Sequence, residues 1–131
     1  MRHISIDTNI YSAFKKGDSR IIEVFQHADT IGIDITVLAE LLAGFKQGNR
    51  EKQNRQSLED FINNNRVILL PHNENTAEFY ADIYLLLRKK GKPIPTNDIW
   101  IAATAMQSGR ALFSLDAHFQ KIDGLLLMPF E

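Results

Sequence analysis

The chain of 131 residues contains no cysteine, one tryptophan and only four prolines. The absence of cysteine excludes a disulfide framework and a thiolate metal site. The sequence also lacks any apolar, charge-free run of the roughly 18 residues that a membrane span needs. Near the N-terminus there is neither the long apolar core nor the small-residue cleavage site of a signal peptide. We therefore expect a cytoplasmic protein with no membrane attachment.

No charge of one sign dominates, since 15 basic and 16 acidic side chains leave a net charge of −1. This balance by itself argues neither for nor against a nucleic-acid partner. Hydrophobic residues at 44% and charged residues at 24% are ordinary values for a globular protein. The length is that of one domain, which we place at residues 1–131, and such a chain buries about 68% of its unfolded surface.

The hydrophobic pattern alternates between strands and helices. Strands are predicted at residues 4–6, 30–35, 66–70 and 111–115, with an edge strand at 125–128, and the strand at 66–70 is expected to be covered on both faces. Helices are predicted at 9–16, 19–25, 37–45, 57–62, 76–90 and 97–108, with N-caps at Thr36 and Thr96 and a polar, solvent-facing segment at 48–55. This alternation predicts an α/β fold with three layers, α/β/α, around a mostly parallel central sheet of four or five strands.

Four acids stand where the chain leaves a predicted strand or enters a predicted helix: Asp7, Glu40, Asp98 and Asp116. The carboxyl ends of parallel strands are where open α/β sheets hold their ligands. Each acid also fits an ordinary local role when it is taken alone. Asp7 and Asp116 suit helix N-caps, and Asp98 suits the first turn of a helix.

Glu40 and Asp98 are harder to explain locally. A capping box on Thr36 would need its glutamate at position 39, so Glu40 comes one residue late. Asp98 lies on a helix with almost no other polar side chain, and a carboxylate on a buried helix needs a partner. Asp34 also follows a strand, and it either caps the helix at 37–45 or joins the other acids.

A shared site for these acids would need a cation. Two carboxylates about 4 Å apart repel by about 4 kcal/mol at an effective dielectric constant of 20. A site built from carboxylate oxygens favours Mg²⁺ or Mn²⁺ over zinc. The chemistry that follows is phosphodiester hydrolysis, in which a metal activates water and steadies the leaving oxygen.

Four stretches carry a family resemblance: IDTNIYSAF at 6–14, ITVLAELLAGF at 35–45, PTNDIWIAATAM at 95–106 and LFSLDAHFQKI at 112–122. Their order and spacing over nearly the whole chain resemble PIN-domain ribonucleases, most closely the VapC-type toxins of bacterial toxin–antitoxin pairs. The resemblance implies a PIN-like fold and a magnesium-dependent endoribonuclease.

Residue by residue, the resemblance implies that the catalytic acids are Asp7, Glu40, Asp98 and Asp116. Asp7 and Asp98 would bind the metal directly, and Asp116 and Glu40 would complete the site through waters or a second ion. Supporting polar positions are Thr8, Asn9, Asn97 and Ser114, the last of which is often threonine in the family. The resemblance also implies RNA, often tRNA, as the substrate, a homodimer, and a VapB-like antitoxin that inserts into the groove and forms a higher hetero-oligomer.

Several other residues have two interpretations. A basic group at the end of the helix at 76–90 fits a phosphate-binding surface and equally fits cations at a helix C-terminus: Arg88, Lys89, Lys90 and Lys92. His118 has no metal-ligand spacing to another histidine. Trp100 and Phe119 are expected in the core.

Other families with an acid after the first strand fit less well. A haloacid-dehalogenase-type phosphatase needs a second aspartate where this chain has Asn9. A response-regulator receiver needs an aspartate after a central strand, and this chain has Leu70, Pro71 and His72 there. A PIN-like fold that binds RNA or protein without catalysis remains the alternative, because fold does not fix function.

Overall fold

A central parallel sheet organises the chain, of which the computed structural model describes residues 2–129. Its strands are β1 (His3–Ile6), β2 (Thr30–Asp34), β3 (Val67–Leu70) and β4 (Ala111–Phe113). They pair in the order β3-β2-β1-β4, and every pairing is parallel. The predicted α/β fold is therefore confirmed, with four strands in the sheet.

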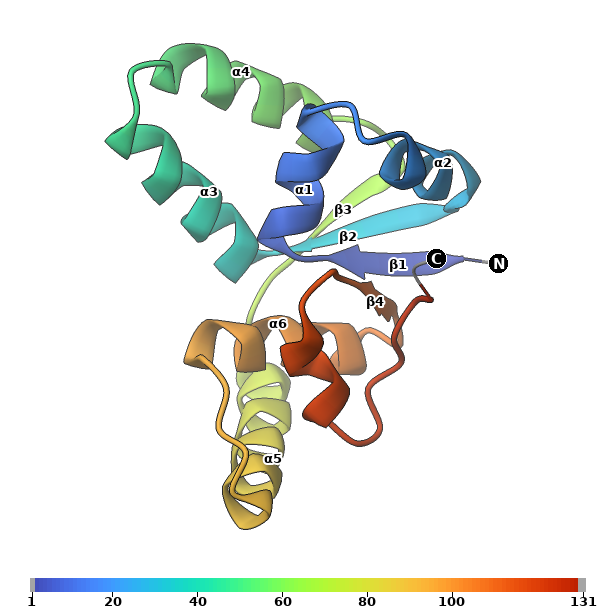
Figure 1. The fold of residues 1–131 in the computed structure, drawn as a ribbon, viewed down its shortest axis with the longest axis vertical. Helices are drawn as coiled ribbons and strands as arrows, with labels where there is room; N and C mark the ends of the chain where they lie inside the picture. The colour runs from blue at the N-terminus through green and yellow to red at the C-terminus, as the bar shows by residue number, and fades with distance from the viewer. Residues whose placement is uncertain (1, 130–131) are drawn as a thin grey trace.

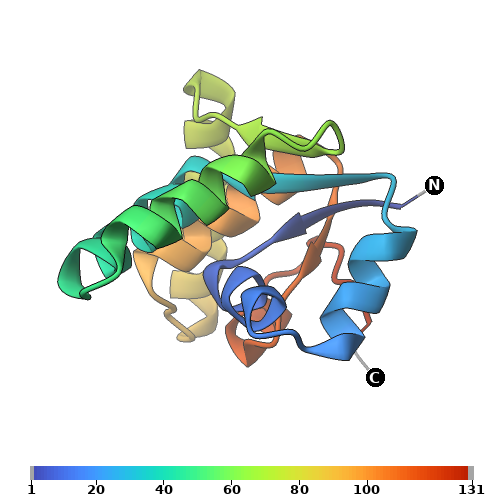
Figure 2. The same ribbon diagram turned by 90° about the horizontal axis from the view of Figure 1, so that it is seen from above.

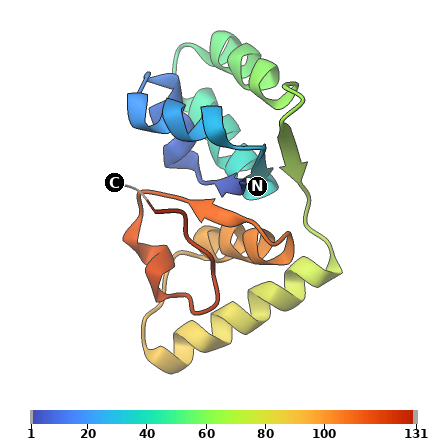
Figure 3. The same cartoon turned by 90° about the vertical axis from the view of Figure 1, so that its right-hand side faces the viewer.

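Helices cover both faces of this sheet, as Figure 1 shows. On one face lie α1 (Thr8–Lys15), α2 (Ser19–His27), α3 (Ile35–Gln47) and α4 (Glu51–Ile62). On the other lie α5 (Glu74–Lys90), α6 (Thr96–Gln107) and the 3-10 helix η1 (Ala117–Lys121). Figure 3 shows α6 between the sheet and the long α5. This is the predicted three-layer arrangement.

The centre of the sheet is tightly packed. Ile4 and Ile6 of β1 are at most 1% exposed, as expected for a strand with neighbours on both sides. Gly32 of β2 lies where any side chain would collide, since a Cβ atom there would stand 2.7 Å from Leu70 Cδ1 and 3.0 Å from Arg110 Cδ. Only glycine at this position lets the side chains of Leu70 and Arg110 pack directly against the β2 backbone.

Two strand predictions were wrong. β3 is an edge strand rather than one covered on both faces, and Ile68 and Leu69 are each 39% exposed. The predicted edge strand at 125–128 is reduced to one isolated parallel bridge between Leu112 and Leu127. Apolar composition does not reveal which strand ends the sheet or whether an apolar run forms a full strand.

Three predicted helix starts also need correction. Asp34, and not Thr36, is the N-cap of α3, and its carboxylate accepts a hydrogen bond from the Thr36 amide. α5 starts at Glu74, before the predicted start at 76, because Asn73 forms a capping box with Thr76. α6 starts with Thr96 as its first helical residue, after Pro95, which provides no side-chain cap.

The polar segment at 48–55 is mostly helical, which the sequence interpretation missed. α4 begins at Glu51, whose carboxylate lies 3.4 Å from Lys46 Nζ and 3.6 Å from Arg55. Leu58 is its buried anchor. Figure 1 shows α4 turning back from the end of α3 so that the two helices form a V, which Figure 2 shows from above. Contact with α3 therefore decides helix formation where the local hydrophobic pattern is weak.

α6 is the most deeply buried helix, as predicted. Its buried residues are Ile99, Ile101, Ala102, Ala103, Thr104 and Ala105. Small side chains allow it to pack closely between the sheet and α5. It is also short, and within residues 2–129 no helix has the length and apolar character needed to cross a membrane.

Candidate active site

Asp7 lies between the end of β1 and the start of α1, so it stands at the carboxyl edge of the sheet. Its Oδ1 accepts a hydrogen bond from the Ile10 amide at 3.0 Å, and it is thus the N-cap of α1. The residue is only 5% exposed. Burial raises the pKa of the Asp7 carboxyl above its ordinary value, and the charges of Asp116 and Asp98 raise it further. The cap role and the proximity to other acids therefore coexist.

Ser114 connects Asp7 to the end of the neighbouring strand. Its hydroxyl donates to Asp7 Oδ2 and accepts from the Asp116 backbone amide at 2.9 Å. Asp116 in turn caps η1 by accepting a hydrogen bond from the His118 amide at 2.9 Å. Because β1 and β4 are paired neighbours, these turns lie together at one edge of the sheet.

Glu40 reaches the same region from α3. Its Oε1 accepts a hydrogen bond from the Thr8 hydroxyl at 2.6 Å, and its Oε2 accepts one from Nδ2 of the Asn97 side chain at 3.3 Å. These two contacts hold Glu40 between the first turns of α1 and α6. Its charge also contributes to the raised pKa of Asp98, after the effects of burial and of Asp116.

Asp98 lies in the first turn of α6 and faces His118. Asp98 Oδ2 and the ring Nδ1 of His118 are 2.9 Å apart, and the same nitrogen lies 3.2 Å from Asp116 Oδ1. Burial is the largest cause of a raised pKa at Asp98, while the hydrogen bond from His118 lowers it. The partner that a carboxylate on a buried helix requires is therefore a histidine 20 residues further along the chain.

The donor set fits a divalent cation. One atom each from Asp98, Asp116 and His118 lies within 4.8 Å of the others. The Asp7 carboxylate is close enough for the charges of Asp98 and Asp116 to raise its pKa. Two or three carboxylates with one imidazole can hold Mg²⁺, Mn²⁺ or a softer divalent metal. The structure thus brings together all four predicted acids, with Thr8, Asn97 and Ser114 hydrogen-bonded to them.

His118 is the member of this site that sequence reasoning missed. It has no second histidine at metal-ligand spacing in the sequence. The usable signal was the pair Asp116 and His118, two residues apart at the start of a short helix. A capping aspartate accepts a hydrogen bond from the backbone amide two residues later, which places that residue beside the carboxylate.

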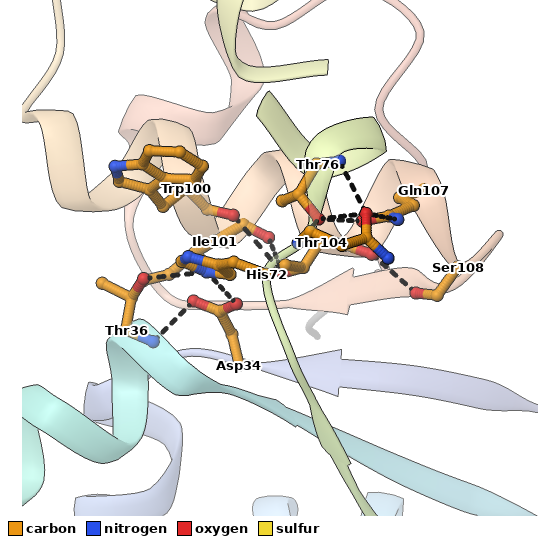
Figure 4. A network of polar contacts seen from close by, with 10 residues as sticks. Asp34, Thr36, His72, Thr76, Trp100, Ile101, Thr104, Gln107 and Ser108 are labelled. Atoms are coloured by element: carbon orange, nitrogen blue, oxygen red, sulfur yellow. Dashed lines mark hydrogen bonds and ion pairs between the residues drawn. The ribbon is translucent and has the colours of Figure 1, made fainter. Parts of the chain in front are cut away.

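Two other candidates lie apart from the acids. Asp34 is fully buried, and its carboxylate accepts hydrogen bonds from the Thr36 backbone amide at 2.9 Å and from His72 Nε2 at 2.8 Å (Figure 4). His72 is stacked on Trp100, with ring centroids 4.6 Å apart, so Trp100 is half-buried under other rings. Asn9 is exposed, and its side chain makes no hydrogen bond within residues 2–129.

The basic group at the end of α5 is exposed and makes no contact with the acids in the part of the chain that the structure describes. Arg88, Lys89 and Lys90 form the last turn of α5, and Lys92 follows in the loop. Lys90 Nζ lies 2.7 Å from Asp123 and donates to the Lys121 carbonyl at 3.2 Å. Lys90 therefore connects α5 to the end of η1 and the residues after it. Phe119 is buried in the core, as predicted.

Comparisons with known proteins agree with this geometry. The family model of the PIN domain matches residues 4–125. Over 131 residues the chain is 30% identical to Ribonuclease VapC2 of Rickettsia felis, covering 96% of both chains. Over 111 residues it is 32% identical to Ribonuclease VapC2 of Haemophilus influenzae, covering 83% of each.

Solved structures show the same likeness. The chain superimposes on a chain of VapBC2 from Rickettsia felis, bound to a DNA fragment from its promoter, with a TM-score of 0.86, 26% identity and 98% coverage of both chains. It superimposes on a chain of DNA-bound VapBC from Salmonella typhimurium with a TM-score of 0.88, 25% identity and 100% coverage of both.

Proposed function

Because the chain belongs to the PIN-domain family, we propose that it is a metal-dependent endoribonuclease of the VapC type. Its proposed catalytic residues are Asp7, Glu40, Asp98 and Asp116. The observation that carries the proposal is the convergence of these acids, from four separate segments, at the carboxyl edge of the sheet. The raised pKa values of Asp7 and Asp98 support it, since burial is the main cause and the neighbouring carboxylates add to it, and a bound cation would offset both effects.

Asp7, Asp98 and Asp116 are the groups that would hold the ion, which we propose to be Mg²⁺ or Mn²⁺. When bound, such an ion lowers the pKa of water and stabilises negative charge on phosphate oxygens. The chain's part is to hold these carboxylates at the same edge of the sheet. Ser114 does so for two of them at once, because its hydroxyl bridges the Asp7 side chain and the Asp116 backbone.

Glu40 has a different part in the proposal. Thr8 and Asn97 occupy one oxygen each and leave the remaining lone pairs of the carboxylate free. We assign Glu40 to water, which it orients and from which it accepts a proton during attack on the phosphodiester. Asn9, exposed on the first turn of α1, is proposed as a neighbouring substrate contact.

The substrate proposed is RNA, which the ribonuclease names of the relatives support. The family resemblance favours tRNA as the class of RNA. Arg88, Lys89 and Lys92 are exposed cations that would hold the phosphate backbone, whereas Lys90 is engaged with Asp123.

The proposed partners are a second copy of the chain and a VapB-like antitoxin, in a hetero-oligomer formed in the cytoplasm. Relatives solved as VapBC complexes support this assignment. Tyr84 and Leu85, 45% and 50% exposed on α5, provide apolar surface for an interface.

The test compares wild type with Asp98→Asn for RNA cleavage, with Mg²⁺ and with EDTA, and for growth arrest on expression. We expect cleavage and arrest only for the wild type, and cleavage only with the ion. Asp34→Asn is the matched control, since it alters a buried capping aspartate outside the site and should leave cleavage per folded molecule unchanged. Cleavage that survives chelation, or equal toxicity of wild type and Asp98→Asn, would reject the mechanism. Binding of RNA without cleavage by either protein would favour a catalytically silent binding module.

A further inference from the structure

His118 contributes a nitrogen atom to a site whose other donors are oxygens. Its Nδ1 lies 2.9 Å from Asp98 Oδ2 and 3.2 Å from Asp116 Oδ1. The side chain is 40% exposed, so ordinary core packing does not account for its orientation. It contacts the two acids from η1, the short helix that contains it.

The turn around His118 fixes its position. The His118 amide donates to Asp116 Oδ1, and the next residue, Phe119, is 1% exposed and anchors η1 in the core. The histidine is thus held between a capping contact on one side and a buried aromatic ring on the other. A side chain held this way loses little further conformational freedom when it binds a ligand.

The distances suit coordination as well as hydrogen bonding. With ligand–metal bonds of about 2.1 Å, adjacent ligands of an octahedral ion stand about 3.0 Å apart. The two measured separations from Nδ1 are 2.9 and 3.2 Å. Both separations from Nδ1 therefore match those between adjacent ligands of one ion, and all three donor atoms lie within 4.8 Å of one another.

We propose that His118 is a nitrogen ligand of the metal and that it makes the site prefer Mn²⁺ over Mg²⁺. This inference rests on the proposed function and adds a ligand and a metal preference to it. Mg²⁺ is a hard cation that favours oxygen ligands, whereas an imidazole nitrogen favours the first-row transition metals, of which Mn²⁺ also accepts carboxylates readily. Adding the nitrogen therefore strengthens the binding of Mn²⁺ more than the binding of Mg²⁺.

The experiment titrates the metal-free full-length chain with Mn²⁺ and with Mg²⁺ by calorimetry. It also measures electron spin-echo modulation of the bound Mn²⁺, which detects a directly coordinated ¹⁴N nucleus. We compare wild type, His118→Gln and the control His27→Gln. The control alters an exposed histidine of α2 whose side chain, within residues 2–129, bonds only to the Glu23 carbonyl. Circular dichroism establishes that each variant is folded.

We expect the nitrogen modulation in wild type and His27→Gln and its loss in His118→Gln. His118→Gln should weaken Mn²⁺ binding by about tenfold or more, at least what the loss of a supporting group costs a metal site. Its Mg²⁺ affinity should change by less than about threefold, because glutamine offers an oxygen in place of the nitrogen.

The two levels of the proposal fail in different ways. Mn²⁺ that binds to the wild type without nitrogen modulation, or equal weakening of both ions by His118→Gln, overturns the ligand role of His118 and leaves the nuclease proposal in place. Absence of Mn²⁺ and Mg²⁺ binding together with absence of metal-dependent RNA cleavage overturns both. Asp98→Asn, which removes a carboxylate, should weaken both ions together.

Discussion

Asp7→Asn should stabilise the metal-free protein while it abolishes the response to metal. Asparagine is as good an N-cap as aspartate, so the hydrogen bond from the Ile10 amide at 3.0 Å is retained. The amide group can also donate to the Ser114 hydroxyl, which now donates to Asp7. What the variant removes is a negative charge that is 5% exposed and close to Asp98 and Asp116.

The magnitude follows from two opposing effects. The pKa of Asp7 is raised, chiefly by burial, and each unit of such a rise costs the folded state about 1.4 kcal/mol at neutral pH. Loss of the negative charge at the start of α1 costs about 0.3–1 kcal/mol. We expect relief of the buried charge to outweigh this loss, so the free energy of unfolding should rise, and the unfolding midpoint should rise by roughly 3–5 °C for each kcal/mol gained in a domain of this size.

The pH dependence has a definite sign. Because the pKa of Asp7 is higher in the folded state, the folded chain binds this proton more tightly than the unfolded chain does. Wild-type stability should therefore fall as pH rises from 3.8, the ordinary value, through the raised folded value. The advantage of Asp7→Asn should be absent below pH 3.8 and complete above the folded pKa.

The assay is thermal unfolding by circular dichroism at acidic and neutral pH, in EDTA and in excess Mg²⁺. Wild type should gain about 1.4 kcal/mol when the free ion is tenfold above its dissociation constant, and the variant should gain almost nothing. Asp34→Asn, a buried cap paired with His72, should instead destabilise the chain. A metal-free Asp7→Asn protein that unfolds at lower temperature than wild type at neutral pH would refute the assignment of Asp7 to a strained anionic site.

Two further predictions follow from the hydrogen bonds. Ser114→Ala should lower the RNA cleavage rate by about 10- to 100-fold with little change in stability, and Ser114→Thr should restore it, because the hydroxyl orients Asp7 and Asp116. Failure of threonine to rescue the rate would show that the hydroxyl is not the active feature. His72→Ala should cost about 2 kcal/mol in urea unfolding, since it leaves the buried Asp34 carboxylate without its 2.8 Å hydrogen bond. Cleavage per folded molecule should stay unchanged, and a selective loss of cleavage would instead connect Asp34 to the catalytic site.

Local sequence rules predicted most of the secondary structure and the acids themselves. Asp7 and Asp116 were recognised both as possible caps and as residues at strand ends, and each is in fact a cap beside the other acids. The alternation of strands and helices predicted a parallel sheet, and in such a sheet the carboxyl ends of strands share one edge. The convergence of the acids was therefore predictable before their contacts were known.

The start of α4 and the edge position of β3 were not predictable in this way. α4 has few apolar residues, and its first turn is stabilised through contacts of Glu51 with Lys46 and Arg55. β3 is as apolar as a central strand, yet Ile68 and Leu69 remain 39% exposed at the edge. Both features depend on which neighbour an element meets, and the local pattern does not contain that information.

The sequence by itself determined which chemical groups stand at the ends of strands, because caps, turns and hydrophobic periods act over only a few residues. Tertiary structure alone decided their partners. It places His118 beside Asp98, 20 residues away in sequence, and His72 beside Asp34, 38 residues away. The physical reason is that a side chain's neighbours are set by how whole elements cross and pack. Asp34, the N-cap of α3, is therefore buried against His72, whereas Asp98, in the first turn of α6, lies among other acids and beside His118.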